Sequence, residues 1–446
     1  MSSSRAPSDW KESESALDSF VGAYPIRKTG THFSGICASA PLAGVRVLDL
    51  TRVVSGPFAT MQLGDLGADI AKVEQPGAGD ESRAFGPPFL GGESAYFLSI
   101  NRNKRGCAID LKSDAGKDVL RRLASIADVI VENFRPGTLE RLGLGYDQLA
   151  RGNPRLILCS ITGFGRSGPD ADRPGYDLIV QGESGVMDIT GEAGGPPTKV
   201  GTSIADMVSG LYATQAVLAA LMRRERTGQG GRLDISMLDA MASLLTFNAG
   251  IYFSTGQSPA RRGSAHATIS PYEPHEAADG WINVGVANDK FWKLFCAAIG
   301  HEELASDARF AKAPDRVVHR AALKDILAPI FRQKQRAHWR AVLEKAGVPV
   351  GEIRTVGEVC EAPQLQARGV VQTVKHPAAG DVRHIASAVR FDDAPPPPAR
   401  RPPLLGEHTR EILSEWLGLS AGEIDAYARD GAFGESQETT STGGAP

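Results

Sequence analysis

The amino-acid sequence predicts an α/β protein built on a mostly parallel sheet, with a smaller α+β block in the middle of the chain. Short apolar, β-branched runs alternate with helical segments over residues 45–161, which is typical of a sheet covered by helices on both faces. After Met222 the chain changes to a charged turn, one more strand and a long Gly/Ser/His-containing loop. Prolines between 395 and 403 then form an extended arm that a helix cannot include.

The first half supplies the strands that define the sheet. Short apolar runs bounded by turn residues predict strands at 45–50, 70–74, 108–111, 128–132 and 156–161. Helices are expected at 55–66 and 113–127. The run 163–168 matches GxGxxG, but Pro169 and Pro174 follow it where a dinucleotide site needs a helix. We therefore predict a loop there, which disfavours an NAD-dependent oxidoreductase and leaves the loop free to wrap a thioester.

The second half is predicted to mix helices with short strands. An apolar stretch at 211–222 has almost no polar face, so we expect a buried helix there. The elements expected after it are a strand at 232–237, a helix at 238–248, a hairpin near 281–285, a basic helical run at 316–336 and strand-like pieces at 348–356, 368–374 and 383–389. Thr409 is expected to cap a last helix at 410–417.

Composition and charge narrow the class of protein. The 446 residues are 42% hydrophobic, enough for one large core or two moderate ones. A net charge of −3 with no long basic run argues against a nucleic-acid partner. No stretch approaches 18 uninterrupted apolar residues, so we expect no membrane span. The first 40 residues are polar and carry acids, which argues against a targeting peptide and for a cytoplasmic enzyme.

The cysteines and the tail add two further expectations. The five cysteines are scattered without a CxxC pair, which is typical of free thiols and argues against a structural zinc site. Cys159 falls inside an apolar strand-like run, where we expect a buried, inert thiol. The tail at 431–446 is rich in Gly, Ser and Thr and is expected to be disordered.

Asp206 is the most informative residue of the chain. It lies where a small-residue loop, 201–205, becomes the apolar helix. One interpretation is a helix N-cap, the commoner role of such an Asp, since its carboxylate accepts from the free amides of a first turn. The other is a nucleophile, because a helix N-terminus keeps a carboxylate ionised and flanking glycines leave room for an acyl group. The two roles are compatible.

Four segments give the chain a resemblance to a known family. They are PLAGVRVLDLT at 41–51, VENF at 131–134, ITGFG at 161–165 and PLLGEHT at 403–409. Over about residues 41 to 415 the chain resembles the class III coenzyme A transferases, which include formyl-CoA, carnitine-type and dicarboxylyl-CoA transferases. In that family the residue at the position of Asp206 is the catalytic aspartate, so the resemblance favours the nucleophile.

The resemblance also implies a domain layout and an assembly. N- and C-terminal parts would form a Rossmann-like large domain, the middle a small α+β domain, and two chains an interlocked homodimer. The corresponding ranges are 1–40 for a flexible extension, 41–204 for the CoA-binding part, 205–232 for a linker helix and turn, 233–311 for the small domain, 312–332 for a second linker, 333–430 for the C-terminal part and 431–446 for the tail.

Site residues are carried over from the family one by one. Asp206 would be the nucleophile and Asp177 a helper, with an ordinary turn residue as the alternative for Asp177. The coenzyme-binding positions would be Val54, Ser55, Gln75, Ile109 to Lys112, Asn133, Phe134, Arg135 and Arg141. Lys112 and Arg141 are the physically sensible phosphate partners.

Two parts of this assignment depart from the family or leave alternatives open. Gln75 stands where formyl-CoA transferase has an arginine; the nearby candidates to replace that arginine are Arg52, Lys72, Lys104 and Arg105. In the middle block, Gly263 and His266 would belong to a loop that covers the site. The alternative for His266 is a loop histidine of no catalytic role.

The function implied is transfer of coenzyme A from an acyl-CoA to a free carboxylic acid, through an aspartyl mixed anhydride and an aspartyl-CoA thioester. The CoA thioester is a substrate, and we expect no tightly bound cofactor and no metal. The run 261–272 is most similar to the branch that uses succinyl-CoA and dicarboxylates, including the succinate–hydroxymethylglutarate enzymes. In that reading, Arg52, Arg261 or Arg262 would pair with a distal carboxylate.

The alternatives are an α-methylacyl-CoA racemase, a formyl- or oxalyl-type CoA transferase, and a CoA-binding protein without catalysis. Tyr146 stands where a racemase is expected to have its histidine, and two-base proton exchange needs that second group. A transferase is therefore preferred.

Overall fold

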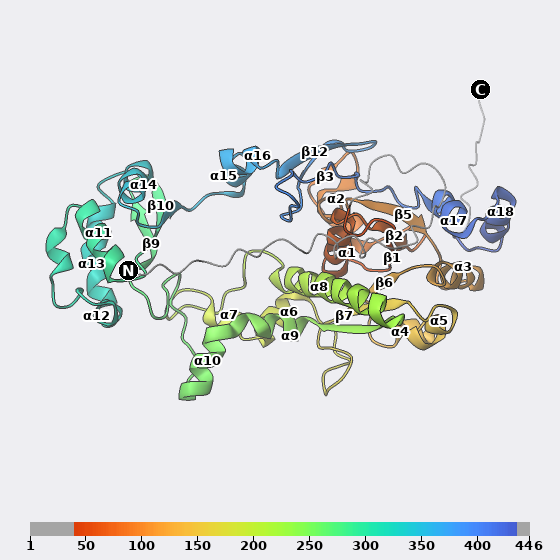
Figure 1. Cartoon of the computed structure of the whole chain (residues 1–446), viewed down its shortest axis with the longest axis horizontal. Coiled ribbons are helices and arrows are strands. Elements are labelled where there is room, and N and C mark those ends of the chain that lie inside the picture. The colour runs from red at the N-terminus through yellow and green to blue at the C-terminus, as the bar shows by residue number, and fades with distance from the viewer. Residues whose placement is uncertain (1–39, 435–446) are drawn as a thin grey trace, which may run out of the picture. The chain divides into compact units, whose positions relative to one another are not determined.

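The computed structural model describes residues 40–434, and its largest sheet is a six-stranded parallel one (Figure 1). The strands are β1 (Arg46–Asp49), β2 (Asp69–Glu74), β5 (Lys104–Ala108), β6 (Val129–Glu132), β7 (Ile157–Thr162) and β8 (Gly231–Ser236). They lie in the order β5-β2-β1-β6-β7-β8 with every neighbouring pair parallel. This is the strand order of the doubly wound dinucleotide-binding fold, whose direction of growth reverses between its first and fourth strands, here β1 and β6. The predicted parallel α/β core is confirmed.

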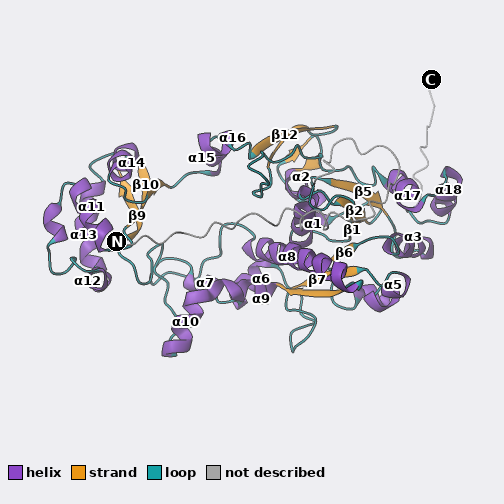
Figure 2. Ribbon diagram, viewed as in Figure 1, coloured by secondary structure: helices purple, strands orange, loops and turns teal. Residues whose placement is uncertain are grey.

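Helices cover both faces of this sheet (Figure 2). One face packs against α1 (Ser55–Asp65), α6 (Asp177–Glu183), α8 (Ile204–Thr227) and α9 (Met237–Ala242). The other packs against α3 (Asp114–Ala124), α5 (Tyr146–Gly152), α17 (Thr409–Leu417) and α18 (Ala421–Arg429). Because both faces are covered, β6 and β7 are buried at every residue. The C-terminal helices thus share a core with strands from the first half of the chain.

The middle of the chain forms an antiparallel unit with its own core. Its sheet has the order β11 (Val350–Glu352), β10 (Gly280–Gly285), β9 (Tyr272–Ala277). Helices α11 (Asp289–Ala298), α13 (Arg320–Phe331) and α14 (Arg336–Lys345) pack around it, with Trp292 and Phe331 fully buried. This unit has the α+β character that the sequence predicts.

The remaining elements are short. They are β3 (Phe89–Leu90), β4 (Glu93–Ser94), α2 (Ala95–Ile100), α4 (Thr138–Arg141), α7 (Val186–Ile189), α10 (Thr246–Thr255), α12 (Ala313–Val318), α15 (Val356–Cys360), α16 (Pro363–Ala367) and the hairpin β12 (Val371–His376) with β13 (Gly380–Ile385). Most of the predicted N-terminal extension and of the predicted tail lies outside the described residues.

Several predicted elements have different bounds. The third strand, β5, starts at Lys104 instead of 108, because Lys104 and Arg105 are buried by ion pairs that a sequence pattern does not reveal. The predicted helix at 238–248 is broken into α9 and α10, and the helical run at 316–336 into α12, α13 and the start of α14. The predicted start of the small domain at 233 falls inside β8, which pairs with β7.

Helix α8 also differs from the prediction. It begins at Ile204, and Leu211 and Met222 are 50% and 70% exposed, so one face is open and not buried. Within residues 40–434 it is the one helix whose length and composition would suit a membrane span, and 44% of that stretch is buried inside the protein. Since Ala213 and Val217 pack into the core beside the sheet, we interpret α8 as a core helix.

Two single-residue predictions have opposite outcomes. Cys159 is buried in β7, as predicted, and burial raises the pKa of its thiol, in keeping with an inert role. Thr409 is the first residue of α17 and does not cap it. Its Oγ1 instead accepts from the Ala108 amide at 2.9 Å and donates to the Gly406 carbonyl at 2.8 Å.

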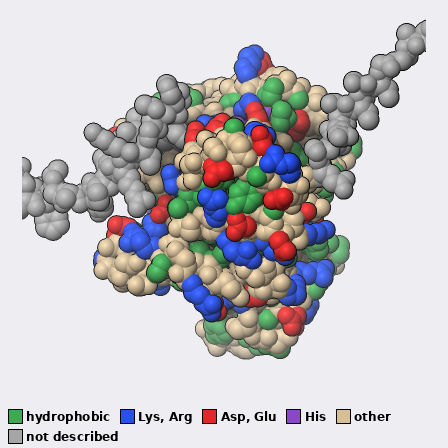
Figure 3. Space-filling model, turned by 90° about the vertical axis from the view of Figure 1, so that its right-hand side faces the viewer, with side chains coloured by type: hydrophobic (Ala, Val, Ile, Leu, Met, Phe, Trp, Pro, Cys, Tyr) green, Lys and Arg blue, Asp and Glu red, His purple; other side chains and the backbone are tan. Residues whose placement is uncertain are grey.

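On the face of the molecule in Figure 3, acidic and basic side chains are interspersed, in keeping with the small net charge.

Candidate active site

A cavity of about 580 Å³ lies at the carboxyl ends of the parallel strands. The end of every strand contributes to its lining: 50–55 after β1, 73–75 in and after β2, 109–112 after β5, 133–136 after β6, 161–163 in and after β7, and Met237 after β8. Open α/β sheets bind ligands at this edge, next to the point where the strand order reverses. The fold therefore marks this cavity as the candidate active site.

Asp206 lies in the first turn of α8 and lines the cavity. Gly210, one turn later, explains how α8 comes so close to the start of α1. A Cβ at Gly210 would lie 2.7 Å from the Ser55 carbonyl oxygen, so only glycine permits this approach. Asp206 is thereby brought to the same cavity as Ser55, a predicted coenzyme-binding residue.

A second glycine contact folds the predicted loop after β7 into the same wall. No helix follows Gly163 before α6, as predicted from the prolines. A Cβ at Gly163 would lie 2.5 Å from the Gly175 Cα, so the two backbones touch. This contact holds Arg173 to Tyr176 in the cavity wall and places Asp177 directly beyond it.

The Asp206 carboxylate is half-buried and has no hydrogen bond or ion pair within residues 40–434. Burial, followed by the nearby charge of Asp177, raises the pKa of Asp206 from 3.8 to about 7. The N-cap of α8 is Ser203, and the Asp206 carboxylate accepts no capping hydrogen bond from the amides of the first turn. The N-cap interpretation of Asp206 is therefore wrong.

Asp177, the predicted helper, lies at the start of α6 and holds the backbone next to Asp206. Its Oδ1 accepts from the Ala205 amide at 2.9 Å, and its Oδ2 accepts from Gln181 Nε2 at 2.7 Å. Asp177 is therefore more than a turn residue. Asp177 itself does not line the cavity.

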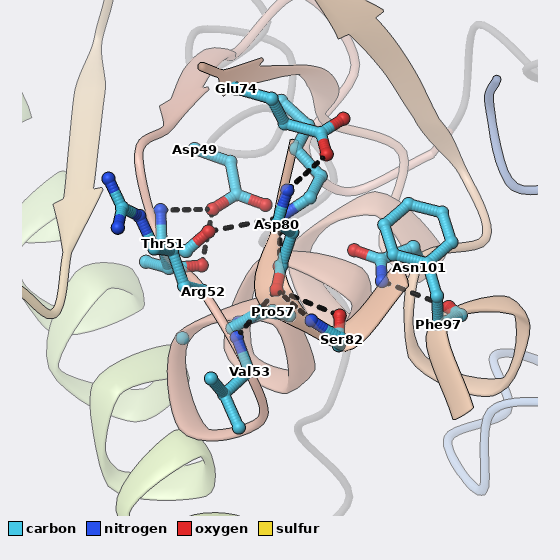
Figure 4. Close-up of polar contacts among 12 residues, drawn as sticks. Asp49, Thr51, Arg52, Val53, Pro57, Glu74, Asp80, Ser82, Phe97 and Asn101 are labelled. Atoms are coloured by element: carbon cyan, nitrogen blue, oxygen red, sulfur yellow. Dashed lines mark hydrogen bonds and ion pairs between the residues drawn. The ribbon is translucent and has the colours of Figure 1, made fainter. Parts of the chain in front are cut away.

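The part of the cavity wall at 51–53 rests on a buried network of charges (Figure 4). Asp49, fully buried, accepts from Lys104 Nζ at 2.9 Å and from the Thr51 amide at 3.0 Å. Lys72 Nζ donates to the Thr51 carbonyl at 3.0 Å and to Asp80 Oδ2 at 2.9 Å. These bonds fix the backbone that leaves β1.

Asp80 extends the network to a strained residue. Its Oδ1 accepts from the Val53 amide at 3.1 Å, and Val53 has a φ of 65°, which is rare for a β-branched residue. Asn133 holds the neighbouring Arg52 at both its amide (2.9 Å) and its carbonyl (2.8 Å). These hydrogen bonds hold the backbone of the cavity wall at 52–53 in place.

Most of the predicted coenzyme-binding residues meet in this cavity. Its lining includes Val54, Ser55, Gln75, Ile109, Lys112, Asn133, Phe134 and Arg135. Arg141 is the exception: it is absent from the lining, and its guanidinium donates to Thr138 Oγ1 at 2.9 Å. Among the described residues, no ion pair or hydrogen bond engages the Lys112 or Arg135 side chain, so both charges remain free for an anion.

The candidate replacements for the missing arginine at Gln75 separate clearly. Lys72, Lys104 and Arg105 are buried in ion pairs, so they are not phosphate partners. Arg52 does line the cavity, with its guanidinium 5.1 Å from the centre of the Phe134 ring.

The predicted residues of the middle block lie outside this lining. His266 stacks on Phe247 with ring centres 5.8 Å apart, and the Gly263 amide donates to the Gly191 carbonyl at 2.8 Å. Arg261 is paired with Asp188 at 2.8 Å. Neither Arg262 nor the racemase-position Tyr146 lines the cavity.

Sequence reasoning missed one cation of the cavity wall. Arg173 lines the cavity, lies 4.4 Å from the centre of the Phe164 ring, and is ion-paired to Asp170 and Glu183 near the surface. Its place between two prolines gave no signal in the sequence. Within residues 40–434, no group of three or more His, Cys, Asp or Glu side chains is arranged to hold a metal ion.

Comparison with known proteins identifies the relatives of this chain. Residues 42–409 match the model of CoA-transferase family III. The chain is 41% identical over 412 residues to succinyl-CoA:glutarate CoA-transferase of Mus musculus, covering 92% of this chain and 94% of the mouse protein. It is 40% identical over 381 residues to succinate–glutarate CoA-transferase of Agrobacterium fabrum, covering 84% and 95%. Among solved structures, a CAIB/BAIF family protein from Brucella suis superposes with a TM-score of 0.77 at 41% identity, covering 84% and 99%.

Proposed function

The chain belongs to CoA-transferase family III, and we propose that it moves coenzyme A from succinyl-CoA to a dicarboxylate through covalent intermediates on Asp206. One observation carries this proposal. Among the described residues, the Asp206 carboxylate has no counter-ion, and no side chain pairs with Lys112 or Arg135, the two cations in the same cavity. A carboxylate that no partner occupies is available to attack, and free cations suit the phosphates of a coenzyme.

The first half of the proposed reaction transfers coenzyme A to the enzyme. An Asp206 oxygen attacks the thioester carbonyl carbon, the C–S bond breaks, and the CoA thiolate leaves behind a mixed anhydride. The thiolate then attacks the aspartyl carbonyl, which expels the donor as a free carboxylate and forms an aspartyl-CoA thioester. The thioester free energy is retained at each step.

The second half runs the same chemistry in reverse with a new acid. The acceptor carboxylate attacks the aspartyl carbonyl of the thioester and releases the CoA thiolate. This step leaves a second anhydride, between the acceptor and Asp206. The thiolate attacks the acceptor's acyl carbon, and the Asp206 carboxylate is regenerated with the new acyl-CoA. Since water would hydrolyse each intermediate, the walls formed by 51–55 and 173–176 must exclude it.

The proposed acids follow from the relatives and from one cation. The mouse and Agrobacterium relatives are named for succinyl-CoA or succinate and for glutarate. Arg173 lines the same cavity as Asp206, and it forms exposed ion pairs with Asp170 and Glu183, which are weak. A substrate's distal carboxylate can therefore replace them. We propose Arg173 as the group that recognises it.

An interlocked homodimer, implied by the family resemblance, is part of this proposal. Large apolar side chains on α10 and around it are exposed in the single chain: Leu244, Phe247, Tyr252 and Phe253. Their exposure supports a partner chain. Light scattering is expected to report a dimer that dilution does not dissociate, and an active monomer would contradict this part.

The covalent step is tested by trapping. Incubation with succinyl-CoA followed by hydroxylamine is expected to convert Asp206 to a hydroxamate, detected as a mass shift of its peptide. The Asp206→Ala protein is the control and is expected to show no adduct. An unmodified Asp206 during turnover, or full transfer by the alanine variant, would show that the reaction does not pass through this residue.

A further inference from the structure

Gln181 is a fully buried polar side chain of α6 that takes no direct part in the cavity lining. It lies one helical turn after Asp177, so the two side chains share one face of α6. Both point their polar atoms at the segment 200–205, which leads directly into Asp206.

The two side chains fasten that segment near each of its ends. Gln181 Oε1 accepts from the Val200 amide at 2.9 Å. Gln181 Nε2 donates to Asp177 Oδ2 at 2.7 Å, and Asp177 Oδ1 accepts from the Ala205 amide at 2.9 Å. One amide side chain thus anchors the start of the segment and orients the carboxylate that anchors its end.

The second anchor substitutes for a missing helix cap. The first amides of any α-helix have no partner within the helix, and a side chain at the N-cap normally accepts from one of them. The N-cap residue of α8, Ser203, makes no such bond. The Asp177 carboxylate, from a different helix, accepts from the Ala205 amide instead, in the turn that carries Asp206.

Asp206 depends on this turn more than most side chains would. Its own carboxylate has no hydrogen bond or ion pair to another described residue. Its position is therefore set by the backbone of the first turn of α8. A displacement of about 1 Å in a reacting group is enough to cost on the order of 100-fold in rate.

We propose that Gln181 is a positioning residue for Asp206, acting through Asp177 and the 200–205 backbone. The inference rests on the proposed function, because it assigns a role in placing the nucleophile of that reaction. Gln181 does not line the cavity, so it is not placed to touch the coenzyme or the acid. Its effect falls on the steps in which bonds to the Asp206 carboxyl group form and break.

The test is Gln181→Met, which keeps the length and the burial and removes every hydrogen bond. We expect kcat to fall about 10- to 100-fold, while KM for succinyl-CoA stays unchanged because the coenzyme-binding residues come from other segments. The single-turnover rate of hydroxamate formation at Asp206 is expected to fall by the same factor. If Gln181→Met does not fold, Gln181→Glu serves, since it keeps the acceptor for Val200 and loses the donor to Asp177; the same loss of kcat is expected.

The matched control is Asn153→Leu. Asn153 is also a side-chain amide that holds the backbone, with bonds of 3.0 and 2.8 Å to the Ala124 and Ala127 carbonyls, but it lies outside the cavity lining. The Asn153→Leu substitution is expected to lower the melting temperature and to leave kcat unchanged. Wild-type kcat in both Gln181 variants, or a rise in KM that accounts for the whole loss, would overturn the inference. Failure of the proposed function would be separate: the wild-type protein would then form no hydroxamate at all.

Discussion

Two aspartates have pKa values shifted in opposite directions: Asp49, which supports the cavity wall, and Asp206, which lines the cavity. Asp49 lies at the end of β1, is fully buried, and faces Lys104 and Lys72. Burial alone would raise its pKa, but the two lysines and the bonds from Thr51 and Lys104 hold it well below the usual range. Asp206 is only half-buried, yet its pKa is raised to about 7 by burial and by Asp177.

The difference shows that partners, more than depth, decide what a buried carboxylate does. A carboxylate that faces two cations stays ionised, and its oxygens accept hydrogen bonds that hold the structure, here the wall at 51–53. A carboxylate with no cation and one like-charged neighbour stays basic and uncommitted. Perturbation of the second kind is what functional sites show. The predictions below test whether the two aspartates really divide into a structural and a reactive one.

The largest expected effect is on activity at Asp206. Asp206→Asn is expected to lose transfer activity by about 10⁴-fold or more, as removal of a covalent nucleophile does. Because the Asp206 side chain makes no hydrogen bond or ion pair within residues 40–434, the free energy of unfolding at pH 8 is expected to stay the same or to rise. Steady-state assays and urea unfolding of the same sample measure both. An active Asp206→Asn protein that has not deamidated would remove the contrast.

Asp49 is expected to show the reverse pattern. Asp49→Asn leaves two buried lysines with less compensation, and breaking a buried ion pair costs about 3–5 kcal/mol. The urea midpoint of the variant is expected to fall accordingly, whereas the fraction that remains folded is expected to form the Asp206 hydroxamate. A stability equal to that of the wild-type protein would mean that the network at 49–53 contributes little.

The pH dependence gives the next effect. Asp206 attacks only when ionised, so with a pKa of about 7 the value of kcat/KM is expected to fall about tenfold per pH unit below 7 and to level off above it. The sign for stability is opposite. The folded protein holds a proton with a pKa of about 7 against 3.8 when unfolded, so stability from this group is present at low pH and is lost as pH rises from about 4 to 7. Asp206→Asn is expected to remove that slope. If kcat/KM instead fell only near pH 4, the pKa of Asp206 would not be raised, and the proposed contrast with Asp49 would be wrong.

The smallest expected effect concerns the choice of acid. Arg173→Gln is expected to lower kcat/KM for glutarate by about tenfold, the value of one charge-assisted hydrogen bond. A monocarboxylate acceptor of equal length serves as the control and is expected to be used as by the wild-type protein. An equal loss of kcat/KM for both acceptors would show that Arg173 does not recognise the distal carboxylate of a dicarboxylate.

The sequence supported much of the fold and part of the site. Strand positions such as 128–132 and 156–161 were confirmed nearly residue for residue, because both are continuous apolar runs. The third strand was predicted too late in the chain, at 108 instead of Lys104, because a sequence pattern assigns charged residues to the surface until their partners are known. Arg141, assigned to the coenzyme, does not line the cavity itself but donates to Thr138, which does, so its assignment stays a prediction. The assignments of Asp206, Gly263 and His266 to catalysis remain predictions.

What the sequence by itself determined is the alternation of strands and helices, the absence of a helix after 163–168, and the identity of the chemical groups available, since these depend on neighbours along the chain. What only the tertiary structure decided is the charge state and the freedom of those groups. Asp49 and Lys104 are 55 residues apart, and Asp177 lies 28 residues before the Ala205 amide that it holds. Electrostatic energies depend on distance in space and on burial, and neither can be read from a position in the chain.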